Sequence, residues 1–191
     1  SIGRMSGDHA GVRSGLAFLI GLRSDGLQAA MEVVLEHLFL SPGHNYFGRH
    51  GQEAGGHELV ACEELKLHAG RGIAGDRFFD WKLDYKGQIT FFDAAVADEI
   101  LAHAGNPEAG PGAFRRNVVM RGVDLNTLIG VTFEVQGIRF QGVEECRPCY
   151  WMDQACGTEG IEDLMKGRGG LRCRILDDGV LRRGIAECRV I

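Results

Sequence analysis

The 191-residue sequence lacks a long hydrophobic run, an excess of positive charge and a dense cysteine framework. The apolar stretch at residues 15–22 is far too short to span a bilayer, so no membrane segment is expected. A net charge of −5 gives no electrostatic reason to expect a nucleic-acid partner. Six cysteines in a chain of this size do not form a disulfide scaffold, and they favour a reduced, cytoplasmic setting.

Phosphate-binding fingerprints of the Walker or Rossmann type are also missing, as are internal repeats and low-complexity tracts. Glycine, by contrast, is abundant: 29 residues, about 15% of the chain, against a typical value of about 7%. So many glycines indicate frequent turns and favour short strands over long helices. The length fits about one domain, which can bury a sizeable core without disulfide support.

The most reactive motif in the chain is Cys146-Arg147-Pro148-Cys149. It follows two strand patterns, so we expect a loop at the rim of a sheet. Pro148 fixes its own φ near −65° and removes a backbone donor, which restrains the second thiol. A cationic neighbour such as Arg147 favours the thiolate, the form that attacks electrophiles or binds metal.

Such a pair is compatible with a structural zinc site, a redox dithiol, or one working thiol with a bystander. Zinc requires a matching second pair, and neither Cys156, Cys173 nor Cys188 supplies one at zinc spacing, so we expect no zinc. A redox pair is expected to open a helix after a strand in a βαβ unit, whereas the surrounding patterns predict antiparallel hairpins. Two buried, inert cysteines are a further alternative, which the polar, proline-containing context disfavours.

Apolar periodicity predicts a mainly β protein with minor α content. Strands are expected at residues 32–40, 57–67, 88–92, 114–122, 131–136, 138–141, 171–176, 180–182 and 186–191. A helix capped by Asp93 is expected through residue 103, and a shorter one over residues 158–165. Asp178-Gly179 is a tight-turn signal that predicts a hairpin between two of the last strands. This element count favours a closed or partly closed antiparallel β-barrel with a few short helices packed outside.

The roles of two segments stay open. Residues 1–30 form an N-terminal extension whose charged residues interrupt any signal-peptide pattern too early, and the single barrel domain is expected over residues 31–191. The polar loop at residues 44–51 carries two histidines and an arginine. It either lines a site or is an ordinary solvent-exposed loop.

Arginines next to polar partners mark two further candidate positions. A glycine-rich segment, residues 69–79, contains Asp76 followed by Arg77; a carboxylate can orient an arginine that still presents its donors to an oxyanion. Arg116 stands beside Asn117 in the strand predicted at residues 114–122, where a polar cluster at a strand end is typical of a site.

Together these motifs resemble the MOSC family, the domain shared with the C-terminal part of molybdenum-cofactor sulfurase. The resemblance runs from about Leu38 to the C-terminus, and its motifs occur in the family's order. They are Gly72-Ile73-Ala74-Gly75-Asp76-Arg77, Arg116-Asn117-Val118, Leu128-Ile129-Gly130, Cys146-Arg147-Pro148-Cys149, Gly167-Arg168-Gly169-Gly170-Leu171, Asp178-Gly179-Val180 and Gly184.

The resemblance implies a β-barrel with one cysteine that accepts sulfane sulfur as a persulfide or ligates molybdenum. Cys149, which follows the proline, matches that cysteine and is the predicted catalytic residue and metal ligand. Cys146 departs from the family pattern; it is either idle or resolves an oxidised Cys149. The implied cofactor is the molybdenum cofactor, molybdopterin, held by a set of residues around the anionic pterin phosphate. That set is Asp76, Arg77, Arg116, Asn117, Arg168 and Arg172.

Three functions therefore follow as hypotheses. The chain is a molybdenum-cofactor reductase of N-hydroxylated or related small substrates, a carrier that takes sulfur from a pyridoxal-phosphate-dependent desulfurase as a Cys149 persulfide, or a Cys146/Cys149 thiol redox module. The sequence shows neither a second barrel nor a desulfurase domain, so a partner is expected: a cysteine desulfurase or an electron-transfer protein. Oligomeric state is left open.

Overall fold

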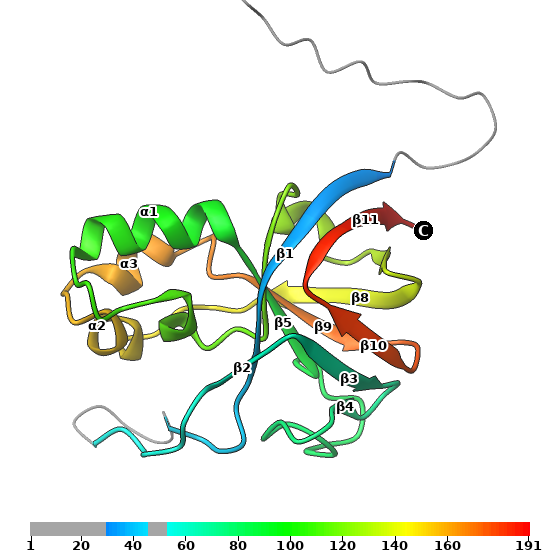
Figure 1. Cartoon of the computed structure of the whole chain (residues 1–191), viewed down its shortest axis with the longest axis horizontal. Helices are drawn as coiled ribbons and strands as arrows, with labels where there is room; N and C mark the ends of the chain where they lie inside the picture. Colours follow the sequence, from blue (N-terminus) through cyan, green and yellow to red (C-terminus); the bar gives the residue numbers. More distant parts are fainter. Residues whose placement is uncertain (1–29, 46–52) are drawn as a thin grey trace, which may run out of the picture.

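The computed structural model describes residues 30–45 and 53–191 (Figure 1). Most of the predicted N-terminal extension and of the polar loop at residues 44–51 therefore lies outside the described residues. The strands are β1 (Met31–Leu40), β2 (Val60–Cys62), β3 (Glu64–His68), β4 (Gly72–Ile73), β5 (Ile89–Asp93), β6 (Val118–Arg121), β7 (Thr132–Val135), β8 (Ile138–Glu145), β9 (Leu171–Ile175), β10 (Gly179–Arg182) and β11 (Gly184–Val190). The helices are α1 (Ala94–Ala104), α2 (Trp151–Cys156) and α3 (Ile161–Met165), with 3₁₀ turns η1 (Pro111–Phe114) and η2 (Leu125–Leu128).

Seven of these strands close into a barrel. Their order is β11-β7-β8-β9-β5-β6-β1, and β1 pairs with β11 to complete the ring, while β2 extends beyond β1. The predicted mainly β barrel with short helices is thus confirmed. The neighbours β5 and β6 are parallel, which makes the barrel mixed. Parallel neighbours need a long crossover connection, and this one contains α1 and η1.

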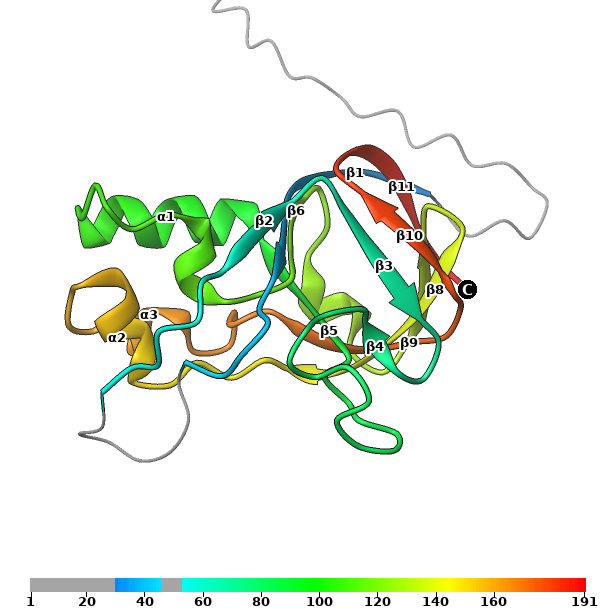
Figure 2. The same cartoon turned by 60° about the horizontal axis from the view of Figure 1, so that its bottom comes forward.

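A smaller sheet of β10, β3 and β4 packs beside the barrel (Figure 2). The hairpin predicted at Asp178-Gly179 is wrong, because β9 pairs with β5 and β8 whereas β10 pairs with β3. The carboxylate of Asp178 accepts a hydrogen bond from the N–H of Ala69, after β3, so the turn leads into the second sheet. The single strand predicted over residues 57–67 is likewise divided into β2 and β3, which belong to different sheets.

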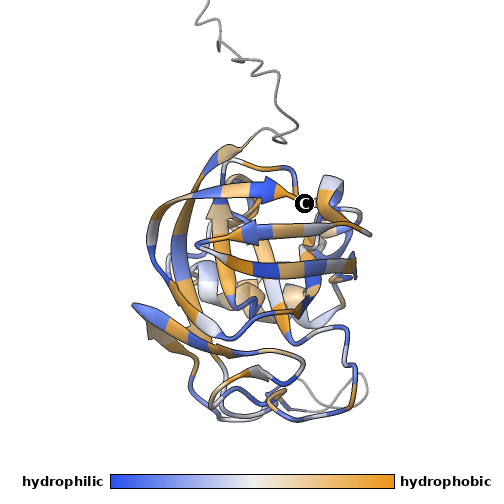
Figure 3. Ribbon diagram, turned by 90° about the vertical axis from the view of Figure 1, so that its right-hand side faces the viewer, coloured by the Kyte–Doolittle hydropathy of each residue, from blue (hydrophilic) through white to orange (hydrophobic). Residues whose placement is uncertain are grey.

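Side chains fill the interior of the barrel. Phe91 contacts Phe133 and Phe140 edge-on, with ring centroids 5.7 and 5.3 Å apart, and all three rings are fully buried. Hydrophobic and hydrophilic residues alternate along the barrel strands (Figure 3), as expected where one face of each strand is buried. Because the interior is packed, a ligand site has to lie outside this core.

A second core lies between the barrel and the helices, which gather on one side of it (Figure 1). Helix α1 begins after Asp93, whose side chain accepts a hydrogen bond from Ala95 N–H, as predicted. Its buried Ile100 packs in this core with Phe92 and Phe114, whose rings lie 4.6 Å apart. Helix α2 was not predicted, and α3 occupies the second half of the segment expected to be helical. No helix within the described part of the chain is long and apolar enough to cross a membrane.

The glycine pair before β9 fixes the position of the cysteine motif. A Cβ on Gly169 would lie 2.5 Å from the carbonyl oxygen of Cys146, and one on Gly170 would lie 2.4 Å from the carbonyl oxygen of Phe91. Gly170 also has a φ of +101°, a conformation that favours glycine. Its carbonyl accepts a 2.7 Å hydrogen bond from Cys146 N–H. Close backbone contact at these two glycines therefore holds the motif at the end of the barrel.

Substitution of Gly169 by alanine is expected to lower the free energy of unfolding by roughly 1–3 kcal/mol, the usual cost of overpacking, because the new methyl group would overlap the Cys146 carbonyl. Gly110→Ala is the matched control, since a Cβ there meets no atom within 4 Å. Urea unfolding followed by tryptophan fluorescence measures both variants. Equal stabilities would contradict the close contact.

Candidate functional site

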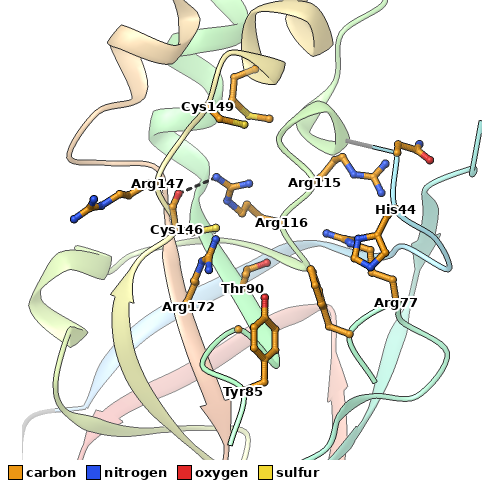
Figure 4. A pocket seen from close by; sticks show the side chains of 14 residues that line it. His44, Arg77, Tyr85, Thr90, Arg115, Arg116, Cys146, Arg147, Cys149 and Arg172 are labelled. Atoms are coloured by element: carbon orange, nitrogen blue, oxygen red, sulfur yellow. Dashed lines mark hydrogen bonds between the residues drawn. The ribbon is translucent and has the colours of Figure 1, made fainter. Parts of the chain in front are cut away.

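An open pocket of about 200 Å³ lies between α2 and the end of the barrel where β8 finishes and β9 begins (Figure 4). Five arginines and both cysteines of the motif line it, and among its described lining residues there is no carboxylate. The full set is His44, Asn45, Arg77, Phe78, Tyr85, Gly87, Thr90, Arg115, Arg116, Cys146, Arg147, Cys149, Met152 and Arg172. In a chain with a net charge of −5, this pocket is a local concentration of positive charge.

The two thiols of the motif differ in access. Cys149 is exposed, whereas Cys146 is only 7% exposed and contributes its sulfur to the pocket wall. All six cysteines are free thiols. The motif connects β8 to α2, so a helix does follow the pair, contrary to the expected run of hairpins. Since β8 and β9 are antiparallel, the setting is still not a βαβ unit.

Arg172, on β9, lies against Cys146. Burial of this guanidinium opposes its charge, but the neighbouring Cys146, with smaller effects of Tyr85 and Glu144, outweighs burial and raises the pKa of Arg172. The Arg172 guanidinium also lies 3.7 Å from Glu144 at the pocket edge. The sequence suggested Arg147 as the cation beside the thiols, but Figure 4 shows its side chain extending away from the Cys146 sulfur.

Arg77 reaches the pocket from the loop that follows β4. Its side chain is 14% exposed, and its Nη1 atom is buried without a hydrogen-bond partner, 3.9 Å from the Asp76 carboxylate. The guanidinium packs over the ring of Phe78 at 4.6 Å. Burial, partly offset by Asp76 and reinforced by the nearby arginines, lowers the pKa of Arg77, yet an arginine remains charged at neutral pH. A buried cationic donor without a partner is well suited to an anion.

Asp76 and Asn117, both predicted to bind cofactor, lie beneath the pocket wall. Asp76 accepts hydrogen bonds from the N–H groups of Ser41 and Phe78 and from the Asn117 amide. The Asn117 oxygen accepts bonds from both the N–H and the hydroxyl of Thr90. Both residues are buried and neither lines the pocket. They position Arg77 and Thr90, which do.

Arg116 joins three separate loops. Its guanidinium donates hydrogen bonds to the carbonyl oxygens of Gly169, Phe114 and Cys146 at 2.9, 2.6 and 2.9 Å. The bond to Cys146 is visible in Figure 4. Arg116, predicted to bind the cofactor, lines the pocket, but its hydrogen-bond donors are used by backbone carbonyls. Arg116 would therefore attract an anion mainly through its charge and not through hydrogen bonds.

Arg115 was predicted to lie in a strand and does not. Strand β6 begins at Val118, and Arg115 ends the turn η1 with a left-handed φ of +52°. In a strand, consecutive side chains point to opposite faces; the left-handed residue breaks this alternation, so that Arg115 and Arg116 both line the pocket. Arg115 also donates hydrogen bonds to the Ser41 hydroxyl and the Gly43 carbonyl.

Arg168 lies away from this pocket. It forms a two-bond pair with Glu99 of α1, at 2.7 and 2.8 Å, and its Nε donates to the Leu164 carbonyl. The structure therefore brings Cys146, Cys149, Arg77, Arg116 and Arg172 together and places Arg168 among the helices.

An aromatic wall completes the pocket; the polar loop at residues 44–51 that begins with His44 was considered as a possible site lining, but Phe78 and Tyr85 were not singled out as site residues. Phe78 contacts Tyr85 at 5.1 Å between ring centroids, and His44 contacts Phe78 at 5.0 Å. Burial raises the pKa of Tyr85, so its hydroxyl keeps its proton. Burial also lowers the pKa of His44, and the charge of Arg77 adds to this effect. Tyr85 lies in a turn region without periodicity, so no signal in the sequence marked it.

The donor set fits an anionic ligand that also engages a thiol. Guanidinium forks suit phosphate and other oxyanions, and a thiolate suits a soft metal or an electrophilic sulfur atom. The volume of about 200 Å³ is below the range of roughly 300–1,000 Å³ common for whole ligands. A small anion fits inside, whereas a pterin-sized group would extend through the open mouth.

Comparisons with known proteins agree with this architecture. The sequence model of the MOSC domain matches residues 64–186, more than half of the chain. The YuaD protein of Bacillus subtilis has a similar structure, with a TM-score of 0.67 and 18% identity over 86% of this chain and all of that one. YiiM from Escherichia coli has a TM-score of 0.53 and 15% identity, over 85% of this chain and 70% of that one.

YiiM from Geobacillus stearothermophilus has a TM-score of 0.56 and 12% identity, over 83% of this chain and 75% of that one. No curated protein matches the sequence. At these identities the solved structures support the fold alone, while the domain match identifies the family. The closed barrel and the cysteine motif at its end agree with this match. Because the domain match covers residues 64–186, this chain belongs to the MOSC domain family.

Proposed function

We propose that the protein binds the molybdenum cofactor in the arginine-lined pocket, with the Cys149 thiolate as a metal ligand, and acts as a reductase of N-hydroxylated or related small substrates. The observation that carries the proposal is the buried Nη1 of Arg77, which has no hydrogen-bond partner and belongs to the same pocket as Cys149. An unsatisfied buried donor is costly, and an anionic group of the ligand would satisfy it.

Each part of the pocket has a separate task in this proposal. Arg77 and Arg172 hold the anionic groups of the ligand, and Arg116 adds charge while it anchors the cysteine loop. Cys149, exposed at the mouth, offers a sulfur to a metal without movement of the barrel. When bound, the cofactor would supply two-electron redox chemistry. The aromatic wall of Phe78 and Tyr85 would exclude water from one side.

A second candidate function is that of a sulfur carrier, with a Cys149 persulfide as the working species. The exposure of Cys149 favours it, because a desulfurase has to bring its own cysteine to the accepting thiol. The modest volume of the pocket also suits a single sulfur atom better than a whole pterin. This function needs a cysteine desulfurase as partner, whereas the reductase needs an electron-transfer protein.

Metal analysis tests the first proposal. Protein purified from a host that makes the cofactor is expected to contain molybdenum, and Cys149→Ser should lose at least the 10–100-fold in metal affinity that removal of an outer-shell partner typically costs. Cys62→Ser, a partly exposed cysteine on β2, is the matched control. Wild-type protein without molybdenum, and without reductase activity after reconstitution, would contradict the proposal.

Anion binding tests the role of Arg77. Arg77→Met is expected to weaken the binding of molybdate and inorganic phosphate by about 10-fold to 100-fold, since a hydrogen bond to a charged group contributes about 1.5–3 kcal/mol. Isothermal calorimetry measures the affinity. Arg189→Met, which removes an exposed arginine on β11, controls for net charge. Equal affinities of the two variants would show that Arg77 does not face the anion.

Mass spectrometry tests the carrier function. After incubation with a cysteine desulfurase and cysteine, one added sulfur atom is expected on Cys149 of the wild-type protein. The Cys149→Ser variant should lack the adduct on this segment because the accepting thiolate is absent. Equal labelling of the two proteins would rule out Cys149 as the carrier.

A further inference from the structure

We propose that Cys146 is a second reactive thiol, which accepts sulfane sulfur from small anionic donors such as inorganic polysulfide. The proposal does not depend on what Cys149 binds. It rests on the place of Cys146 in the pocket, on the arginine beside it and on the hydrogen bonds that hold its backbone.

The two thiols differ in the size of the molecule that can reach them. Cys149 is exposed and open to another protein, whereas Cys146 is 7% exposed and is reached through a pocket of about 200 Å³. A polysulfide of a few sulfur atoms fits such a volume, and the loop of a protein donor does not. Cys146 would therefore react with small molecules and Cys149 with both classes.

Charge favours an anionic sulfur at Cys146. Figure 4 shows the Arg172 guanidinium beside the Cys146 sulfur, where its charge attracts an anionic sulfur donor and stabilises the anionic persulfide that forms. The Tyr85 hydroxyl, which keeps its proton, points into the same pocket. Because the described lining residues include five arginines and no carboxylate, the pocket also attracts an anionic donor.

The backbone at Cys146 is fixed on both sides. Its N–H donates to the Gly170 carbonyl at 2.7 Å, and its carbonyl accepts from Arg116 at 2.9 Å. The sulfur is therefore held against Arg172 within the pocket wall. A thiol that served only as core packing would not need a cation beside it, whereas the Cys146 sulfur lies next to the Arg172 guanidinium in the pocket wall.

The reaction is a sulfur transfer without an external oxidant. The Cys146 thiolate attacks a sulfane sulfur of the polysulfide, and a new S–S bond forms at Sγ. The S–S bond of the donor breaks, and its remaining part leaves with the electron pair as a shorter polysulfide or hydrosulfide. The product is a Cys146 persulfide, whose anionic terminal sulfur stays beside Arg172.

Reagent size tests access. In the Cys149→Ser protein, Cys146 is expected to react with iodoacetamide and with inorganic polysulfide, and to react at least about tenfold more slowly with a polyethylene-glycol maleimide than Cys149 does in the Cys146→Ser protein. Peptide mass spectrometry assigns the site by fragmentation, because Pro148 prevents trypsin from separating the two cysteines. A Cys146 that is inert to iodoacetamide and polysulfide in the native protein would overturn the proposal, as would equally fast labelling by the large reagent.

Removal of the positive charge at position 172 tests whether Arg172 promotes the reaction of Cys146. In the Cys149→Ser background, Arg172→Met is expected to lower the rate of Cys146 alkylation at pH 7 by about fivefold to tenfold, since the thiolate loses its cation. Arg147→Met is the matched control, because this arginine is adjacent in sequence but extends away from the sulfur. Arg172→Lys, which keeps the charge, should retain most of the rate.

The unfolding midpoint of each variant shows whether it is folded, and rates are compared among the variants that keep the wild-type midpoint. If Arg172→Met does not keep the wild-type midpoint, Arg172→Gln, which also removes the charge, replaces it in the comparison with Arg172→Lys and Arg147→Met. An alkylation rate that stays unchanged in a folded Arg172→Met protein, or that falls equally in Arg147→Met, would overturn the role of Arg172 and with it the proposal.

Discussion

The buried guanidinium of Arg116 is the interaction on which the site depends. It binds the carbonyl oxygens of Phe114, Cys146 and Gly169, which belong to three loops that are far apart in the sequence. A buried charge has to be satisfied by hydrogen bonds, so these three loops can meet in only a narrow range of arrangements. Because Cys146 is one of the three, the same constraint sets where the cysteine motif lies relative to the barrel.

The glycine pair before β9 makes this arrangement possible. Gly169 lets the backbone approach the Cys146 carbonyl, and Gly170 lets it pass over β5 at Phe91. Without that approach the Arg116 guanidinium would not reach the Gly169 and Cys146 carbonyls together. Backbone packing and a buried charge therefore act together at one end of the barrel.

Arginines outside the pocket show why the pocket is distinctive. Most form short ion pairs with carboxylates, as do Arg71, Arg121, Arg139, Arg168, Arg174 and Arg183. Within the pocket, by contrast, the carboxylates nearest Arg77 and Arg172 lie 3.9 and 3.7 Å away. The arginine charge is neutralised by carboxylates at these surface positions, whereas in the pocket it is left available to a ligand. This pattern supports the proposal that the pocket binds an anion.

The sequence by itself determined the elements that depend on neighbouring residues. The hairpin of β7 and β8 follows from alternating apolar residues, helix α1 from its Asp93 cap, and the membership of the MOSC family from motifs in a fixed order. Only the tertiary structure decided which cation meets which thiol. The contacts of Cys146 with Arg116 and Arg172 join residues about 30 positions apart, and they exist because β8 and β9 pair and the ring of strands closes. The same dependence on distant pairing explains why the turn at Asp178 leads away from β9, since the partner of β10 is β3.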